Sequence, residues 1–169
     1  MEKALFIIAQ QDFQDQEYAH SREKIEAAGC EITVASIEEG VCRGKFGSEV
    51  RAELAVKDAN VVDYAGVVVV GGPGALSLLE YPEVLELIRQ FGKTEKLVAA
   101  ICIAPLILAE AGVLTGKKAT VYPNEEAIAR MKEIGVEVQE DSIVVDKKTV
   151  TGNGPAAAYR FGEKVAELL

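Results

Sequence analysis

Short, wholly apolar runs alternate with stretches of helical composition along most of this chain. Because such runs have no polar side, the strands they predict must be covered on both faces, as happens in a mostly parallel sheet with helices on either side. Right-handed crossovers then predict a doubly wound, three-layer α/β sandwich. The strand-like runs are residues 4–9, 32–35, 65–70 and 97–101, and the helical stretches after them are 15–28, 75–91 and 103–111.

The remaining segments predict shorter elements. Pro82 is expected to split the stretch 75–91 into two helices, because proline removes a helix hydrogen bond. Residues 37–53 contain three glycines and predict a loop, with an edge hairpin as the alternative. Short strands are expected at 119–122, 136–138, 142–145 and 149–151, and helices at 124–134 and 155–169. No repeat or linker interrupts the pattern, so residues 1–169 are expected to form one domain.

Charge and cysteine content exclude several classes of protein. The 27 acidic and 18 basic residues give a formal charge of −9 with no strongly basic stretch, which argues against binding nucleic acid. No apolar run reaches the roughly 18–20 residues needed to span a bilayer, and the N-terminus lacks a signal-peptide pattern, so we expect a cytoplasmic protein without membrane contact. Cys30, Cys42 and Cys102 form no C-x-x-C pair, so no disulfide framework or metal site is expected.

Cys102 stands at an abrupt change from strand to helix. The run 97–101 ends at this cysteine, and Pro105 follows in what would be the first turn of a helix. A nucleophile elbow has this arrangement and needs small residues two places either side, where this chain has Ala100 and Ala104. The positive end of the helix dipole would favour the thiolate. A buried structural cysteine explains the local sequence equally well.

The segment that contains Glu17 and the segment that contains Gly71 and Gly72 also follow strands. Both are expected to meet Cys102 in one crevice at the carboxyl ends of the strands. Glu17 could face the thiol, in which case its carboxyl would be protonated and donate to the sulfur; a helix-capping role is the alternative, and Asp12 and Asp15 compete with it. The amides of Gly71 and Gly72, and that of Ile103, are candidates for holding an oxyanion.

These residues together resemble the ThiJ/PfpI superfamily, which includes the parkinsonism-associated deglycase and the archaeal PfpI intracellular proteases. The similarity is carried by 4–9 (A-L-F-I-I-A), 12–17 (D-F-Q-D-Q-E), 27–35, 67–72 (V-V-V-V-G-G), 100–105 (A-I-C-I-A-P) and 150–156 (V-T-G-N-G-P-A). The resemblance implies a flavodoxin-like fold that forms a homodimer or a higher homo-oligomer. It also implies that Cys102 is the reactive cysteine and that Glu17, rather than Gln14, is the family's glutamate.

The chain departs from the family pattern at three positions. Ile103 occupies the place where PfpI-type proteases have histidine directly after the cysteine. Tyr122 stands before Pro123 where the deglycase branch has a histidine, and Asn153 replaces an arginine of that branch. His20, the single histidine of the chain, is more simply a helix-surface residue than a base for Cys102, so His20, Tyr122 and Asn153 are accessory candidates.

The leading hypothesis is a cofactor-independent enzyme of glyoxalase or deglycase type, which acts on a small reactive carbonyl compound. Cys102 would attack the aldehyde of a 2-oxoaldehyde, and Glu17 would move protons. One alternative is a non-enzymatic redox sensor or chaperone-like protein that responds through oxidation of Cys102. The other is a PfpI-type protease or amidase, which is disfavoured because Ile103 replaces the general base. It requires His20, from the same or a neighbouring subunit, to reach Cys102.

Overall fold

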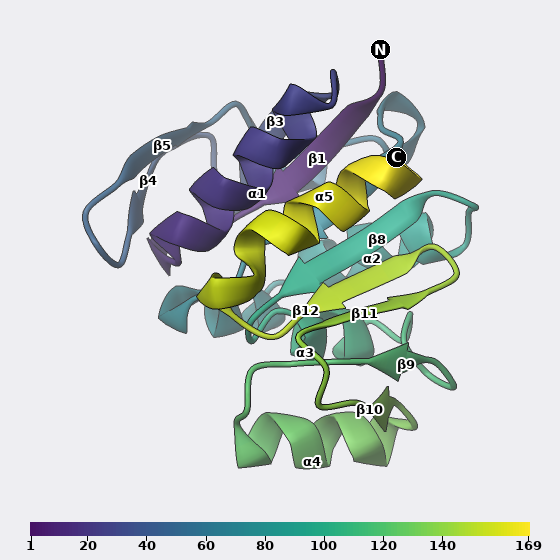
Figure 1. The fold of residues 1–169 in the computed structure, drawn as a ribbon. Coiled ribbons are helices and arrows are strands. Elements are labelled where there is room, and N and C mark those ends of the chain that lie inside the picture. The colour runs from purple at the N-terminus through teal and green to yellow at the C-terminus, as the bar shows by residue number, and fades with distance from the viewer.

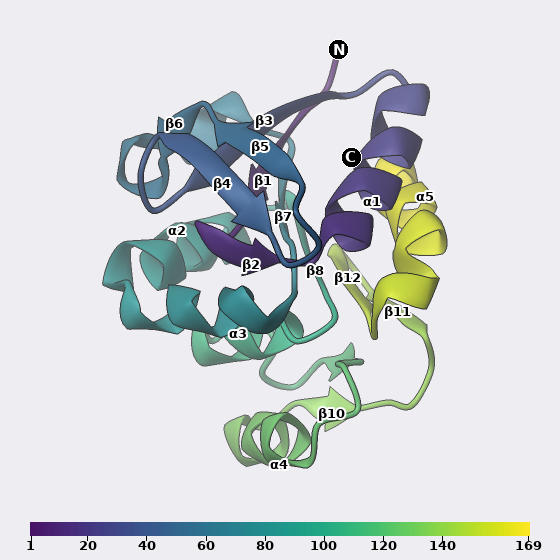
Figure 2. The same ribbon diagram turned by 90° about the vertical axis from the view of Figure 1, so that its left-hand side faces the viewer.

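The computed structural model describes residues 1–169 and contains a seven-stranded sheet between two layers of helices (Figures 1 and 2). The strand order is β11-β12-β8-β7-β1-β3-β6, and every neighbouring pair is parallel except β11 and β12. This confirms the predicted flavodoxin-like sandwich with a mostly parallel sheet. The strands of this sheet are β1 (Lys3–Ile7), β3 (Glu31–Ser36), β6 (Leu54–Ala55), β7 (Gly66–Val69), β8 (Leu97–Ile101), β11 (Ile143–Asp146) and β12 (Thr149–Gly152).

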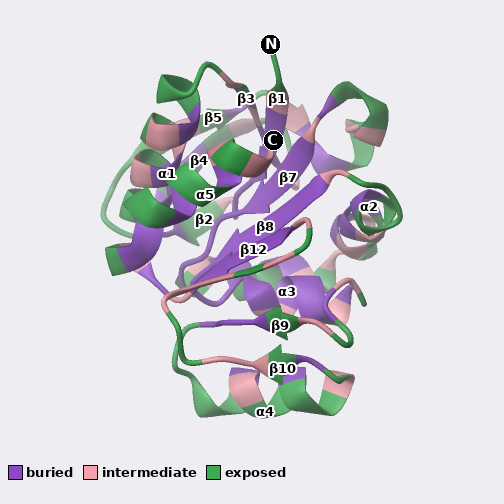
Figure 3. Cartoon of the chain, turned by 45° about the vertical axis from the view of Figure 1, so that its right-hand side comes forward, coloured by how far each residue is buried: buried purple, intermediate pink, exposed green.

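Successive residues of the central strands enter opposite cores, because side chains alternate across a strand. On β1, Leu5 and Ile7 belong to the core beneath α2 and α3, whereas Phe6 belongs to the core beneath α1 and α5. Figure 3 shows these strands buried along their length between partly exposed helices. The helices are α1 (Asp15–Ala27), α2 (Pro82–Gly92), α3 (Pro105–Glu110), α4 (Glu125–Ile134) and α5 (Ala158–Leu168).

The segment predicted as a loop or an edge hairpin forms a hairpin, but not at the edge of the main sheet. Strands β4 (Gly40–Gly44) and β5 (Glu49–Ala52) pair antiparallel, and β4 also pairs with β2 (Gln11–Phe13) in a separate three-stranded sheet. The short strand β2 was not predicted from the sequence. Its pairing carries the hairpin over the carboxyl ends of the main strands (Figure 2).

Two other predictions need correction. The expected strand 119–122 is limited to β9 (Lys118–Ala119), which pairs with β10 (Glu137–Val138). The chain then leaves the strand because the Thr120 N–H donates to the Thr151 hydroxyl and the Tyr122 N–H donates to the Cys102 carbonyl. The stretch 75–91 is divided before Pro82 as expected, but its first half is a 3₁₀ helix, Pro73–Glu80, instead of an α-helix.

Candidate active site

Cys102 occupies a strained corner directly after β8. Its φ angle is 64°, a value that costs energy for a residue with a side chain. The corner is held on both sides: the Cys102 N–H donates to the Gly152 carbonyl (2.9 Å), and the Cys102 carbonyl accepts from the Tyr122 N–H (2.7 Å). Ala100 and Ala104 are fully buried beside it. The predicted elbow geometry is therefore present, and the cysteine is 8% exposed rather than completely enclosed.

Glu17 lies in the first turn of α1 but does not cap that helix. Gln14 is the capping residue, since its side-chain oxygen accepts the Glu17 N–H at 2.9 Å. The Glu17 carboxyl is fully buried, and its Oε1 accepts the Gly71 N–H at 3.1 Å. The other oxygen, Oε2, is buried without a hydrogen-bond partner of standard geometry. A buried carboxyl with a free oxygen is costly unless it is protonated or meets another polar group.

The Cys102 thiol and the Glu17 carboxyl influence each other's ionisation. Burial raises the pKa of Glu17 to about 7, against hydrogen bonds from the Cys102 thiol and the Gly71 amide that lower it. Burial and the negative charge of Glu17 raise the pKa of the Cys102 thiol to about 12, against hydrogen bonds from the Ile103 and Gly72 amides. Glu17 raises the pKa of Cys102 through the negative charge of its carboxylate form. Protonation of Glu17 therefore favours the Cys102 thiolate.

The expectation that the elbow lowers the thiol pKa through a helix dipole was wrong in direction. The Ile103 and Gly72 amides do lower the pKa of the thiol, but burial, and after it the negative charge of Glu17, outweigh them. Above a pH of about 7 the Glu17 carboxyl is ionised while the Cys102 thiol keeps its proton, so the pair holds one proton and one negative charge. Transfer of that proton from Cys102 to Glu17 is the step by which such a pair can give a nucleophilic sulfur.

Two backbone amides are free to act on charge at the sulfur. The N–H groups of Gly72 and Ile103 donate to no backbone carbonyl, and both stabilise the thiolate of Cys102. The Gly71 N–H is not free, because it donates to Glu17. The structure therefore corrects one of the predicted oxyanion donors: Gly72 and Ile103 remain candidates, whereas Gly71 positions the carboxyl.

Gly71 is needed because no side chain fits at this position. A Cβ atom there would lie 2.6 Å from the Cys102 Cβ, 2.6 Å from the Glu17 Oε1 and 2.5 Å from the Ile101 carbonyl oxygen. Strands β1, β7 and β8 are neighbours in the sheet, so the segments at their carboxyl ends meet here as the sequence predicted. The glycine lets the carboxyl and the thiol approach each other.

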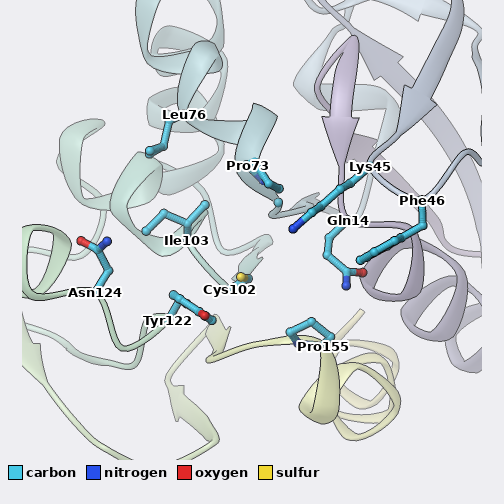
Figure 4. A pocket seen from close by; sticks show the side chains of 11 residues that line it. Gln14, Lys45, Phe46, Pro73, Leu76, Cys102, Ile103, Tyr122, Asn124 and Pro155 are labelled. Atoms are coloured by element: carbon cyan, nitrogen blue, oxygen red, sulfur yellow. The ribbon is translucent and has the colours of Figure 1, made fainter.

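The Cys102 side chain opens onto a pocket of about 310 Å³ at the carboxyl edge of the sheet (Figure 4). Tyr122, one of the predicted accessory residues, lies on its wall, and its backbone also holds the elbow. Lys45 and Phe46 reach the pocket from the tip of the β4–β5 hairpin. The other lining residues are Gln14, Gly72, Pro73, Leu76, Ile103, Asn124 and Pro155.

Two predicted accessory residues lie elsewhere. His20 does not line the pocket; its ring stacks on Tyr159 of α5 with a centroid distance of 4.0 Å. Asn153 lines a different cavity, with Thr120 and Gln139. Within one chain, therefore, no histidine lies beside Cys102, and the protease alternative would need His20 of a neighbouring subunit.

The competing acids of the first loop have other positions. Asp15 accepts the N–H groups of Phe46 and Ser48, both at 2.8 Å, and these bonds fasten the hairpin tip to the start of α1. Asp12 is exposed and has a positive φ of 60°. No group of three or more His, Cys, Asp or Glu side chains is arranged to hold a metal ion.

Sequence reasoning missed the pocket residues that come from the hairpin. Lys45 and Phe46 belong to the segment 37–53, for which the sequence predicted a loop or, alternatively, a hairpin. Their position at the pocket depends on the pairing of β2 with β4, which was not predicted. The one available signal was Asp15, an acidic residue at a helix start that can accept N–H groups from a nearby loop.

Comparison with known proteins places the whole chain among related sequences. A model described as the DJ-1/PfpI family matches residues 2–168. An uncharacterized protein of Methanocaldococcus jannaschii is 38% identical over 99% of this chain and 82% of its own length. A deglycase of Pyrococcus horikoshii is 32% identical over 99% of both chains, and a glutathione-independent glyoxalase of Caenorhabditis elegans is 25% identical over 98% of this chain and 88% of its own.

A solved structure supports the same relationship at the level of the fold. The ThiJ/PfpI domain protein of Brachyspira murdochii matches with a TM-score of 0.94 and 28% identity, and the match covers 98% of this chain and 95% of that one. None of the helices is long and apolar enough to cross a membrane.

Proposed function

Because the chain belongs to the DJ-1/PfpI family, we propose that it is a cysteine-dependent enzyme of glyoxalase or deglycase type, which converts 2-oxoaldehydes or their adducts. The observation that carries this proposal is the contact between the buried Glu17 carboxyl and the Cys102 thiol at a strained corner facing a pocket. The names of the Pyrococcus deglycase and the Caenorhabditis glyoxalase support the same class of substrate. We further propose that the chain acts in the cytoplasm as a homodimer or a higher homo-oligomer.

In the first step, the sulfur of Cys102 attacks the aldehyde carbon of the substrate. The thiol proton passes to Glu17, a carbon–sulfur bond forms, and the carbonyl electrons move to oxygen. Glu17 returns its proton to that oxygen, which gives a hemithioacetal. The amides of Gly72 and Ile103 support this step because they stabilise negative charge on the sulfur, and then on the substrate oxygen that accepts the carbonyl electrons.

In the following steps, Glu17 as carboxylate removes the proton from the former aldehyde carbon and returns it to the neighbouring carbon, while the hydroxyl proton of the former aldehyde carbon passes to the oxygen of the neighbouring ketone. A thioester of a 2-hydroxy acid results, and water cleaves it to release the acid and the thiol. For methylglyoxal, the overall change is addition of one water to give lactate, with no external oxidant or reductant. A carboxyl whose pKa is about 7 suits both directions of proton transfer near neutral pH.

The test is lactate formation from methylglyoxal by the purified protein. Wild-type protein and the Cys42→Ser variant should form lactate at similar rates, because Cys42 lies in the hairpin sheet away from the pocket. Cys102→Ser should lose at least about 100-fold in kcat/KM, since a hydroxyl is a far weaker nucleophile than a thiol. Absence of lactate with wild-type protein, or equal rates with Cys102→Ser, contradicts the proposal.

A second candidate function is supported by the unpartnered Oε2 of Glu17. In a redox-sensing role, peroxide would convert the Cys102 thiolate to a sulfinate in two steps, each transferring one oxygen and releasing one water. A protonated Glu17 would then donate a hydrogen bond to a sulfinate oxygen. Mass spectrometry after mild peroxide treatment should find two added oxygens on Cys102 before any on Cys30 or Cys42. Equal oxidation of all three would contradict this role.

A further inference from the structure

Lys45 is the one residue with a charged side chain among those that line the pocket. The other lining side chains are apolar, amide, phenol or thiol groups. The Lys45 ammonium takes part in no salt bridge, and Figure 4 shows it pointing from the hairpin into the pocket. In a chain with a formal charge of −9, an unpaired cation directed into the pocket that Cys102 lines is a distinct feature.

The hairpin holds Lys45 in this place through several contacts. The Lys45 N–H donates to the Phe13 carbonyl at 2.9 Å, and Asp15 accepts the N–H of the next residue, Phe46. The Lys45 ammonium lies 5.4 Å from the centre of the Phe46 ring, within the range of a cation–π contact. The same helix start that carries Glu17 therefore also fixes the backbone around Lys45.

The charges of the site are arranged at two depths. Glu17 is completely buried behind Cys102 and does not line the pocket, whereas Lys45 is exposed at its wall. Apolar side chains of Phe46, Leu76 and Pro73 line the same pocket. A cation between low-dielectric walls attracts an anion more strongly than one in open water.

We propose that Lys45 is a specificity-determining residue that binds an anionic group, carboxylate or phosphate, on the carbonyl compound that reacts with Cys102. This inference rests on the proposed function and adds the substrate class: aldehydes or aldehyde adducts that carry a negative charge beside the reacting carbon. No covalent step involves Lys45, which acts by electrostatic attraction and by orienting the substrate.

The test compares alkylation of Cys102 by iodoacetate and by iodoacetamide. Both reagents form a carbon–sulfur bond and release iodide, but only iodoacetate is negatively charged. The ratio of the two rate constants cancels the fraction of thiolate, so it reports the charge around the sulfur. Rates at Cys102 are followed by peptide mass spectrometry, because Cys30 and Cys42 can also react.

The Lys45→Met variant should lower the iodoacetate-to-iodoacetamide ratio by about fivefold, as expected for one charge on the wall of the same partly hydrated pocket. Lys45→Arg should keep the ratio near the wild-type value. Lys93→Met is the matched control, since Lys93 is exposed at the end of α2 and precedes β8, at the opposite edge of the sheet. It makes the same change in net charge and should leave the ratio unchanged.

Protection experiments distinguish the two anions. Acetate or inorganic phosphate, added at equal ionic strength, should slow alkylation of wild-type Cys102 by iodoacetamide, and the stronger of the two identifies the preferred anion. The effect should disappear in Lys45→Met. If neither anion slows the reaction, or if slowing persists in Lys45→Met, the inference fails.

These outcomes separate this inference from the proposed function. A ratio that is equal in wild-type protein and Lys45→Met, while Cys102 is alkylated normally, overturns only the role of Lys45. Failure of both reagents to alkylate Cys102 overturns the reactive thiol and the role of Lys45 together.

Discussion

At the scale of single residues, the candidate site places a buried carboxyl beside a buried thiol, and each alters the pKa of the other. Glu17 is fully buried and its pKa is raised to about 7, mainly by burial. The pKa of Cys102 is raised to about 12 by burial and by the carboxylate form of Glu17. The ionisation of the two groups is therefore coupled, and in the proposed mechanism proton transfer between them links nucleophile and base.

This coupling predicts a pH-dependent effect on stability. The pKa of Glu17 is higher in the folded protein, about 7, than its ordinary value of 4.5. The folded state therefore keeps the Glu17 proton where the unfolded state has lost it, so this contribution to stability is complete below pH 4.5 and is lost as pH rises to about 7. Relative to Glu17→Gln, the unfolding free energy of wild-type protein should fall by ~3 kcal/mol across this range.

Urea unfolding of both proteins at pH 4.5 and pH 8 measures this difference. Glu23→Gln is the matched control, because Glu23 is exposed on the same helix and takes part in no salt bridge. Its difference from wild-type protein should not change with pH. A Glu17→Gln difference that is equally independent of pH would show that the native carboxyl is not held in its protonated form.

At the scale of elements, close backbone approach at the end of β7 assembles the pair. Gly71→Ala should lower kcat/KM by at least about 100-fold and the unfolding free energy by about 1–3 kcal/mol, since the added methyl would overlap Glu17, Cys102 and the Ile101 carbonyl. Gly154→Ala is the control: its Cβ would lie 3.8 Å from Tyr122, an ordinary contact. Equal activity of the two variants would contradict the role of Gly71.

The hairpin predicts a second effect at this scale. Asp15→Asn weakens two hydrogen bonds that hold the tip of the hairpin, because a neutral amide accepts less strongly than a carboxylate. Thermal unfolding should show a loss of about 1–3 kcal/mol. The variant should also lower the iodoacetate-to-iodoacetamide ratio, as Lys45→Met does. An unchanged ratio despite reduced stability would mean that Lys45 does not depend on this attachment.

The elements differ in how far the sequence could predict them. Strands β1, β7 and β8 are continuous apolar runs, so their burial, parallel pairing and convergence followed from local pattern. The pairing of β2 with β4 depends on residues far apart in the chain and on weakly patterned segments, so the position of Lys45 and Phe46 could not be read from periodicity. The pKa of Cys102 likewise depends on contacts with Glu17 and on burial, which the sequence does not specify.

At the scale of the whole molecule, the sheet places the three parts of the site on neighbouring strands. Glu17 follows β1, Gly72 follows β7 and Cys102 follows β8, all at carboxyl ends that open into one crevice. The hairpin sheet covers that crevice from the side of β1 and supplies its cation. The fold thus combines a buried carboxyl–thiol pair with an accessible pocket that has a lysine on its wall.

The central claim is that Cys102 and Glu17 act as one unit. The most direct measurement is the rate of lactate formation from methylglyoxal by wild-type protein, Cys102→Ser, Glu17→Gln and the double variant. Each single substitution should lower kcat/KM by at least about 100-fold, and the double variant should be no slower than the slower single variant. Wild-type activity in either single variant, or losses that multiply in the double variant, would contradict the account.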